Sequence, residues 1–340
     1  MQINSYLEKI NSSINNTLTK PPNSNAIGLY QMMAHHISSR INFLSDNSSN
    51  RFNSFGVLCL TSCDATGGDW KKAVPAAMAI EFINGFLEIH DDVAHGNPNR
   101  ESTESIWWKW GPAQAINAGD AMHSMARLAI FNLRDIGVSD DITFEVLSVI
   151  DNTCLKLCET KFYELDSIDK LNLDIENYIE SKRSHHSYLY ECGMLIGSII
   201  SDAPNKIRTT LSQAGLELGT STTISNEIKL FWDMDNQPDQ MVSELLNKKK
   251  VLPVIYAFAT GNANLKRRLG EIYLKRVLEP KDIISIKSIL DEENSKEYCE
   301  NLLSIHINKY NTHINNCDLP KSFSQMFKNL ITILTDEKYF

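Results

Sequence analysis

Hydrophobic residues recur along the chain at steps of three and four, which is the spacing of one face of an α-helix. The strongest pattern covers residues 73–95, where the apolar run AVPAAMAIEFINGFL leads into EIHDDVAH. Further helices are predicted over residues 27–44, 55–64, 111–135, 141–165, 174–201, 206–217, 220–237 and 250–259, with several more toward the end. Only 15 glycines and 10 prolines interrupt the 340 residues, so we expect an all-α protein.

Two stretches rich in Asn and Ser lie outside these patterns. INSSINNTLTKPPNSNA, at residues 10–26, indicates a flexible N-terminal tail, which we assign to residues 1–26. SDNSSNRFNS, at residues 45–54, indicates a loop between two helices. No linker rich in Gly or Pro divides the remainder, so residues 27–340 are predicted to form a single helical domain.

Charge and composition argue against several classes of protein. The net charge is −9 and no basic stripe is present, which argues against nucleic-acid binding. The sequence contains no run of about 18 apolar residues, the length needed to span a bilayer. Its polar start, MQINSYLEKINSS, is unlike a signal or transit peptide. We therefore expect no membrane span and a cytoplasmic location. Seven cysteines, an odd number, fit reduced thiols better than a disulfide framework.

The helix over residues 73–95 carries two carboxylates at an unfavourable end. Gly96 and Pro98 mark where the helix stops, so Asp91 and Asp92 fall in its last turns, where the helix dipole disfavours negative charge. Both belong to a polar stripe on an otherwise apolar helix. The stripe consists of Glu81, Asn84, Glu88, Asp91, Asp92 and His95. Such a stripe predicts the lining of a wet or ion-filled cavity inside a bundle.

A second predicted helix repeats this arrangement. IKLFWDMDNQPD, at residues 228–239, ends an apolar and aromatic segment with Asp233, Asp235 and Asp239, and Pro238 breaks the helix. Two helix ends that both carry carboxylates repel each other unless cations lie between them. Mg²⁺ suits such a place, because it prefers oxygen ligands and commonly combines one or two carboxylates with substrate phosphates.

These regions resemble the two aspartate-rich regions of the trans-isoprenyl diphosphate synthases, the polyprenyl synthetase family. The first lies in AMAIEFINGFLEIHDDVAHGNPNRESTESIWWKWGPAQAINAGDAMHSMARLAI, and the second in FWDMDNQPDQMVSELLNKKKVLPVIYA. ENYIESKRSHHSYLYECGMLIG resembles the family's lysine-bearing middle helix. The resemblance covers residues 50–260 and implies an all-α bundle around a central cavity. Two carboxylate-bearing helix ends would there hold three Mg²⁺ ions and an allylic prenyl diphosphate.

The resemblance implies roles for the matching residues. Metal ligands are expected at Asp91, Asp92, Asp235 and Asp239, with His95 in the place of the family's third aspartate. The expected ligands of the diphosphate are Arg100, Lys182 and Lys249. The expected catalytic residues are Asp91, Asp92, Lys182 and Asp235. Phe86, Glu88 and Trp232 are expected to line the cavity, where aromatic faces could stabilise an allylic cation. Because family members are commonly homodimers, a homodimer is expected.

Several basic positions of the family are altered. Chain-elongating members bind a second substrate, isopentenyl diphosphate, with a basic loop, a histidine and the second of two adjacent arginines. In this chain Asn50 and Asn53 replace two cations of the loop, Asn84 replaces the histidine, and Glu101 follows Arg100. Each lost charge-assisted hydrogen bond weakens binding by roughly 1.5–3 kcal/mol, so these changes indicate an enzyme that ionises an allylic diphosphate without elongating it.

Four functions remain compatible with these residues. We favour a class I terpene synthase, since Asp235, Asp239 and Ser243 have the steps of four found in the second metal motif of those enzymes, which adds Ser243 to the expected metal ligands. A prenyltransferase to a non-isoprenoid acceptor such as an indole is the second possibility. A chain-elongating synthase with unusual ligands and a non-catalytic partner subunit are the others.

Overall fold

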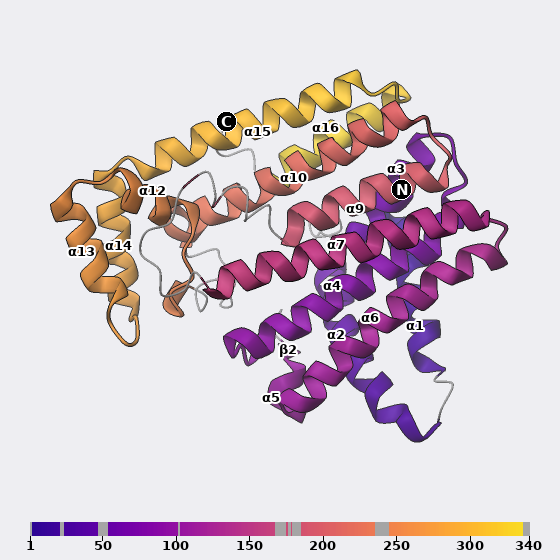
Figure 1. Ribbon diagram of the computed structural model, residues 1–340, viewed down its shortest axis with the longest axis horizontal. Coiled ribbons are helices and arrows are strands. Elements are labelled where there is room, and N and C mark those ends of the chain that lie inside the picture. The colour runs from indigo at the N-terminus through magenta and orange to yellow at the C-terminus, as the bar shows by residue number, and fades with distance from the viewer. Residues whose placement is uncertain are drawn as a thin grey trace.

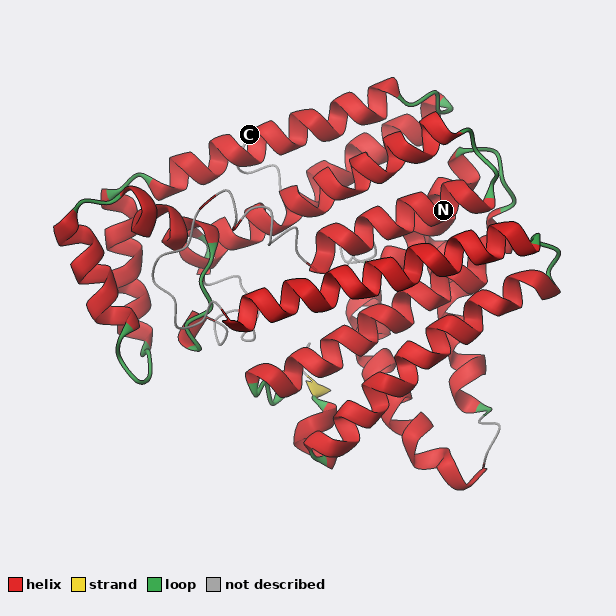
Figure 2. Ribbon diagram, viewed as in Figure 1, coloured by secondary structure: helices red, strands yellow, loops and turns green. Residues whose placement is uncertain are grey.

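The long helical patterns of the sequence form helices that lie side by side in the computed structural model (Figures 1 and 2). The structure describes residues 2–20, 24–46, 54–100, 103–166, 175, 178, 185–234 and 245–335. The α-helices in this part of the chain are α1 (Gln2–Thr19), α2 (Ile27–Asp46), α3 (Phe55–Ala65), α4 (Val74–His95), α5 (Ile106–Trp110), α6 (Pro112–Asp135), α7 (Asp140–Asp166), α9 (His185–Ile200), α10 (Asn205–Trp232), α12 (Leu252–Thr260), α13 (Ala263–Tyr273), α14 (Pro280–Glu292), α15 (Ser295–Asn316) and α16 (Lys321–Thr335). The predicted all-α fold is confirmed.

Short elements complete the described architecture. Two 3₁₀ helices, η1 (Ser24–Ala26) and η3 (Trp70–Ala73), precede α2 and α4. Strands β1 (Asn99–Arg100) and β2 (Thr103–Glu104) form a small antiparallel ladder after α4. This ladder turns the chain back beside the end of α4, which places Arg100 next to the carboxylates of that helix.

The central helices share one apolar core. In it α4 packs against α3, α6 and α9, and α9 packs along α10. The core continues through α1, α7, α15 and α16. A smaller apolar cluster joins α12, α13 and α14, which lie together at one end of the molecule in Figure 1. No helix in the described part of the chain is long and apolar enough to cross a membrane.

The flexible tail predicted for residues 1–26 is wrong for most of its length. Residues Gln2–Thr19 form α1, which packs against α2, α3 and α4. Its buried residues are Tyr6, Leu7, Ile10, Ile14 and Leu18. They recur at helical steps, so the helix buries a continuous apolar stripe. The Asn and Ser residues between them occupy the exposed face of the helix. Their number gives the segment the composition of a flexible tail, although its apolar residues are spaced as in a helix.

Two separately predicted helices, at residues 206–217 and 220–237, are joined in the structure. Helix α10 runs from Asn205 to Trp232 without a break. Hydroxyl groups after the expected boundary donate back to carbonyl oxygens one turn earlier, as Thr220 Oγ1 does to Leu216 O at 2.8 Å. Such bonds satisfy the hydroxyls inside a helix, so the run of Ser and Thr does not end it.

Glycines bring α9 close to α3. A Cβ atom at Gly197 would lie 2.1 Å from Cys59 O, and one at Gly193 would lie 2.7 Å from Phe55 O. Both neighbours are backbone atoms, which cannot move without shifting α3. We therefore expect Gly197→Ala to lower the free energy of unfolding by about 1–3 kcal/mol, the usual cost of overpacking, as measured by urea denaturation.

Gly270 provides the matched control for this prediction. A methyl group at this position in α13 would meet no atom within 4 Å. Gly270→Ala should leave stability unchanged or raise it by roughly 0.5–1 kcal/mol, because alanine loses less backbone entropy than glycine in a helix. Equal stability of the Gly197 variant and the natural chain would show that α3 and α9 do not need this close approach.

Candidate active site at the carboxyl end of α4

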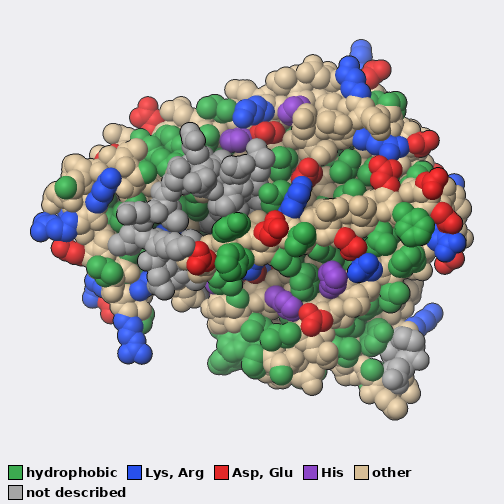
Figure 3. Space-filling model, viewed as in Figure 1, with side chains coloured by type: hydrophobic (Ala, Val, Ile, Leu, Met, Phe, Trp, Pro, Cys, Tyr) green, Lys and Arg blue, Asp and Glu red, His purple; other side chains and the backbone are tan. Residues whose placement is uncertain are grey.

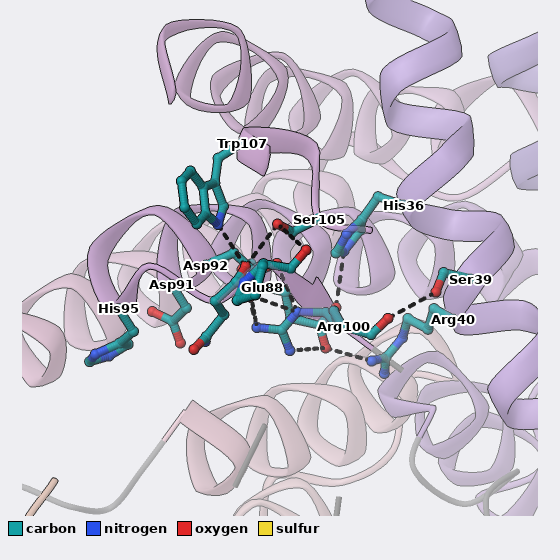
Figure 4. A network of polar contacts seen from close by, with 12 residues as sticks. His36, Ser39, Arg40, Glu88, Asp91, Asp92, His95, Arg100, Ser105 and Trp107 are labelled. Atoms are coloured by element: carbon teal, nitrogen blue, oxygen red, sulfur yellow. Dashed lines mark hydrogen bonds and ion pairs between the residues drawn. The ribbon is translucent and has the colours of Figure 1, made fainter. Parts of the chain in front are cut away.

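Helix α4 ends in a way that fixes its last carboxylates. Gly96 adopts the left-handed conformation with φ of 66°, which glycine reaches without the steric cost that a Cβ atom imposes. The backbone N–H of Asn97 donates to Asp92 O at 3.0 Å. This cap places Asp91, Asp92 and His95 in the final turns, as Figure 4 shows.

Asp92 faces the protein interior, where Arg100 holds it. The residue is 2% exposed. Arg100 Nε lies 3.2 and 3.1 Å from its two carboxylate oxygens, and Arg100 Nη2 lies 2.8 Å from Oδ1. Burial raises the pKa of Asp92 and Arg100 opposes that rise. Burial acts to lower the pKa of Arg100, but Glu88 and Asp92 raise it above its ordinary value.

This pairing bears on two predicted roles. Asp92 was predicted to bind metal, and Arg100 to bind diphosphate. The structure turns the two side chains toward each other in a charge-assisted contact of the strong, forked kind. Arg100 Nη2 also donates to the backbone oxygen of Glu88 at 3.3 Å. Arg100 therefore orients the end of α4, and a role at the diphosphate stays a prediction.

Asp91 lies on a different side of the helix and meets α7. Lys161 Nζ lies 2.9 Å from Asp91 Oδ1 and 2.9 Å from Glu164 Oε1. His95 is one turn after Asp91, and its Nε2 lies 3.1 Å from Glu164 Oε1. The side chain of Asp91 is 24% exposed. Asp91 and His95, at positions i and i+4, thus lie on the face of α4 that meets α7. Asp92 points to another side of the helix, toward Arg100.

Glu88 belongs to a buried network with α2. Arg40 Nη1 lies 2.7 Å from Glu88 Oε1, and His36 Nε2 lies 3.0 Å from Glu88 Oε2. Arg40 Nε also donates to Glu81 Oε2 at 3.2 Å. Burial acts to raise the pKa of Glu88, but Arg40, His36 and Arg100 together hold it well below its ordinary value. Glu88 was predicted to line the cavity, and the structure directs it toward α2 (Figure 4).

The two aromatic residues predicted to line the cavity lie in different places. The Phe86 ring makes an edge contact with His90 at a centroid distance of 4.7 Å and a tilted one with His123 at 5.4 Å. It therefore packs where α4 meets α6. Trp232 Nε1 donates to Asp291 Oδ1 of α14 at 2.8 Å. The structure thus places Trp232 against the cluster formed by α12–α14.

The segment before α12 comes close to the end of α4. Asn247 Nδ2 donates to His95 O at 3.4 Å. The positive charge of Lys249 acts on the ammonium group of Lys161 and opposes its protonation. Lys249 therefore lies close enough to Lys161 for its charge to act there, and its role at the diphosphate stays a prediction. The remaining predicted site residues, Lys182, Asp235, Asp239 and Ser243, lie outside the described residues.

Sequence reasoning missed two groups of residues at this site. Lys161 and Glu164 of α7 contact Asp91 and His95, and Arg40 and His36 of α2 bind Glu88. In the sequence, Lys161 and Glu164 are charged residues near the end of a predicted helix. Charged residues are common at such positions, so they only weakly indicate an active site. Neither pair belongs to a recognised motif, and contacts between helices far apart in the sequence cannot be read from spacing.

Of the predicted metal ligands, Asp91, Asp92 and His95 lie in the described part of the chain. Asp91 offers a partly exposed carboxylate, which is the oxygen ligand that Mg²⁺ prefers, and Mg²⁺ commonly needs only one or two protein carboxylates beside substrate phosphates. Asp92 would first have to leave Arg100. Among the described residues no group of three or more His, Cys, Asp or Glu side chains is arranged to hold a metal ion.

Comparison with known proteins gives one consistent family. Residues 53–290 match the model of the polyprenyl synthetase family. A geranylgeranyl diphosphate synthase of Methanosarcina mazei is 27% identical over 210 residues, which cover 60% of this chain and 63% of that protein. One of Saccharolobus solfataricus is 24% identical over 272 residues, covering 78% of this chain and 81% of the other.

Solved structures show the same fold. The crystal structure of a geranylgeranyl pyrophosphate synthetase from Pyrococcus horikoshii superposes with a TM-score of 0.84 at 24% identity, and covers 99% of this chain and 98% of its own. A decaprenyl diphosphate synthase from Rhodobacter capsulatus superposes with a TM-score of 0.83 at 16% identity, over 98% and 97% of the two chains.

Proposed function

Because the chain belongs to the polyprenyl synthetase family, and so to the enzymes of the isoprenoid-diphosphate class, we propose that it removes diphosphate from an allylic prenyl diphosphate with the help of Mg²⁺. One observation carries the proposal: the last turns of α4 bring the partly exposed Asp91 beside the ammonium group of Lys161, with Lys249 close by. Carboxylate for metal and ammonium for phosphate oxygens thus meet at one helix end.

Each group has a simple task in this reaction. Bound Mg²⁺ would neutralise the diphosphate and make it a better leaving group. Lys161 and Lys249 provide N–H donors for its oxygens, and the Arg100–Asp92 pair keeps the end of α4 in place. Asp235, Asp239 and Ser243 are the metal ligands proposed for the second helix end, and Lys182 is proposed to bind the diphosphate from the family's middle helix.

Chain elongation is the first candidate for the fate of the allylic group. The relatives named above are geranylgeranyl diphosphate synthases, and their names support elongation over the cyclisation that we favoured from the sequence. In elongation the bond between C1 and the diphosphate oxygen breaks, and its electron pair leaves with the diphosphate. C1 then bonds to isopentenyl diphosphate, which loses a proton.

Cyclisation to a terpene, without a second substrate, is the other candidate. A specific observation favours it: the residue at the family's histidine position is Asn84, a buried neutral side chain on α4, which cannot supply a cation to a second diphosphate. The other altered positions, Asn50, Asn53 and Glu101, lie outside the described residues. Transfer to an acceptor such as an indole would also suit a site with little positive charge.

Product analysis separates these fates. Purified protein would receive Mg²⁺ and geranyl, farnesyl or geranylgeranyl diphosphate, each alone, with isopentenyl diphosphate, or with indole, followed by mass spectrometry. A longer prenyl diphosphate that forms only with isopentenyl diphosphate supports elongation. A hydrocarbon or alcohol from the allylic substrate alone supports cyclisation or hydrolysis. If every substrate binds and none is converted, the proposed reaction is wrong.

Exposed apolar side chains on α6 and α7 support a homodimer. They gather on one face of the molecule, as Figure 3 shows. The most exposed are Leu128 at 64%, Phe144 at 60%, Leu155 at 59% and Phe162 at 64%. Such a patch on a protein surface marks an interaction site. We propose that a second copy of the chain covers it.

A charge placed in this patch should weaken the dimer. We expect Leu155→Glu to sediment as a monomer at concentrations where the natural chain sediments as a dimer, because the introduced carboxylate would lose its hydration in an apolar interface. Glu159→Gln, one turn further along α7, is the control and should keep the dimer. A natural chain that sediments as a monomer would refute the proposal.

A further inference from the structure

A buried residue of α10 holds the chain at the start of α12, which packs against α10 (Figure 1). Glu227 is 7% exposed, and its Oε2 accepts the backbone N–H of Leu252 at 2.8 Å. Its other oxygen, Oε1, lies 3.1 Å from the hydroxyl oxygen of Tyr178, which also lies 3.1 Å from the backbone oxygen of Lys250. Glu227 and Tyr178 together thus hold two of the three residues that follow Lys249.

The start of α12 explains why a carboxyl group suits this place. The backbone N–H groups in the first turn of a helix have no partner within the helix. Val251 is the N-cap and forms no side-chain cap, and Pro253 has no N–H to donate. The N–H of Leu252 is therefore paired by Glu227, whose negative charge also suits the positive end of the helix dipole.

The chain before Lys249 is confined as well. Lys248 adopts the left-handed conformation with φ of 65°, which residues other than glycine seldom reach, and its N–H donates to Leu245 O at 2.9 Å. Asn247 Nδ2 donates to His95 O at the end of α4. Lys249 thus lies between a turn tied to α4 and a helix start tied to α10, which limits where its ammonium group can reach.

We propose that Glu227 and Tyr178 are positioning residues, which set the place of the Lys249 ammonium group at the diphosphate by holding the backbone that follows it. This inference deepens the proposed function, on which it rests, because there Lys249 donates to the diphosphate oxygens. Glu227 and Tyr178 act through Lys249. Without the Glu227 carboxyl group the segment can shift, and a displaced ammonium group forms a weaker hydrogen bond, since such bonds weaken steeply with poor geometry.

A double-mutant cycle with inorganic diphosphate tests this coupling. The full chain, with Mg²⁺ present, would be titrated with inorganic diphosphate by isothermal calorimetry as the natural protein, Glu227→Gln, Lys249→Ala and the double variant. Glu227→Gln alone should weaken binding about tenfold, as expected when a charge-assisted hydrogen bond is lost or misaligned. In the Lys249→Ala background it should weaken binding no further, because the residue through which it acts is already gone.

Glu217→Gln is the matched control on the same helix. Glu217 Oε2 lies 2.5 Å from His306 Nδ1 of α15, so the substitution breaks a similar carboxyl contact about 15 Å earlier along α10. It should lower stability without changing the affinity for diphosphate. Tyr178→Phe removes only a hydroxyl group and should weaken binding by about threefold, which gives the same test if Glu227→Gln fails to fold.

Three results would refute the positioning role. Glu227→Gln and Tyr178→Phe could both bind diphosphate as tightly as the natural chain. Lys249→Ala could leave the affinity unchanged. The effect of Glu227→Gln could be equally large with and without the Lys249 side chain, which would mean that Glu227 supports the fold in general and does not act through Lys249.

Binding of inorganic diphosphate does not require turnover. Coupling between Glu227 and Lys249, with no product from any prenyl diphosphate, would support the positioning role and refute the proposed reaction. Product formation by the natural chain, with additive effects of the two variants on diphosphate binding, would support the reaction and refute the positioning role. The two proposals can therefore fail separately.

Discussion

Replacement of Arg40 by alanine is expected to lower the free energy of unfolding by about 3–5 kcal/mol, the usual cost of removing one partner from a buried ion pair. Arg40 is 7% exposed and binds both Glu81 and Glu88. Without it two buried carboxylates lose a cation at hydrogen-bond distance. Urea denaturation followed by circular dichroism measures the loss.

A solvent-exposed arginine gives the matched control. Arg134 Nε lies 2.6 Å from Asp140 Oδ1, but both side chains are more than half exposed. Water and salt screen such pairs, so Arg134→Ala should cost at most about 1 kcal/mol. If Arg40→Ala also lowered the free energy of unfolding by only about 1 kcal/mol, the α2–α4 network would contribute little to stability.

The effect of Arg40 should also depend on pH. The pKa of Glu88 in the folded chain lies well below its ordinary value of 4.5. A depressed pKa contributes stability that is present above the unfolded-state pKa and is lost as the pH falls through the folded-state value. The natural chain and Arg40→Ala should therefore differ most in free energy of unfolding near neutral pH. This difference should become smaller as the pH falls below 4.5.

Asp91→Asn should lower kcat/KM for the allylic substrate by roughly 100- to 1000-fold, the range found when one preorganised charge-stabilising group is lost. The substitution keeps the size of the side chain and removes its charge. Asp91 then no longer attracts a metal ion or holds Lys161 at this helix end. Steady-state kinetics with Mg²⁺ at several concentrations measure the change.

The fold of Asp91→Asn should remain intact, because its side chain is 24% exposed. Asp120→Asn is the control for a general effect of lost charge, since its carboxylate is 66% exposed on α6, and its kcat/KM should be unchanged. Equal activity of Asp91→Asn and the natural chain would remove Asp91 from the catalytic residues.

The sequence was informative where local signals agreed. The apolar run, the polar stripe and the stop at Gly96 predict a helix over residues 73–95, and α4 occupies Val74–His95. The predicted family is confirmed by the match over residues 53–290. Both predictions rest on short-range patterns, which spacing and residue type are enough to specify.

The sequence was less informative where packing decides the outcome. Asp91 and Asp92 are adjacent and appear equivalent in the motif, but the helix turns them to Lys161 and Arg100 respectively. The turn of the helix separates neighbouring residues by about 100°, and only the folded chain shows which helix each one meets. Helix α1 was missed because its apolar stripe is sparse among polar residues.

Diphosphate release tests the central claim most directly. The natural chain and Asp91→Asn would be supplied with geranyl, farnesyl or geranylgeranyl diphosphate, with Mg²⁺ or with a chelator, and free diphosphate would be measured over time with and without isopentenyl diphosphate. We predict Mg²⁺-dependent release from at least one substrate by the natural chain, and far slower release by Asp91→Asn. No release by a folded natural chain that binds these substrates, under any of the conditions, would contradict the proposed function.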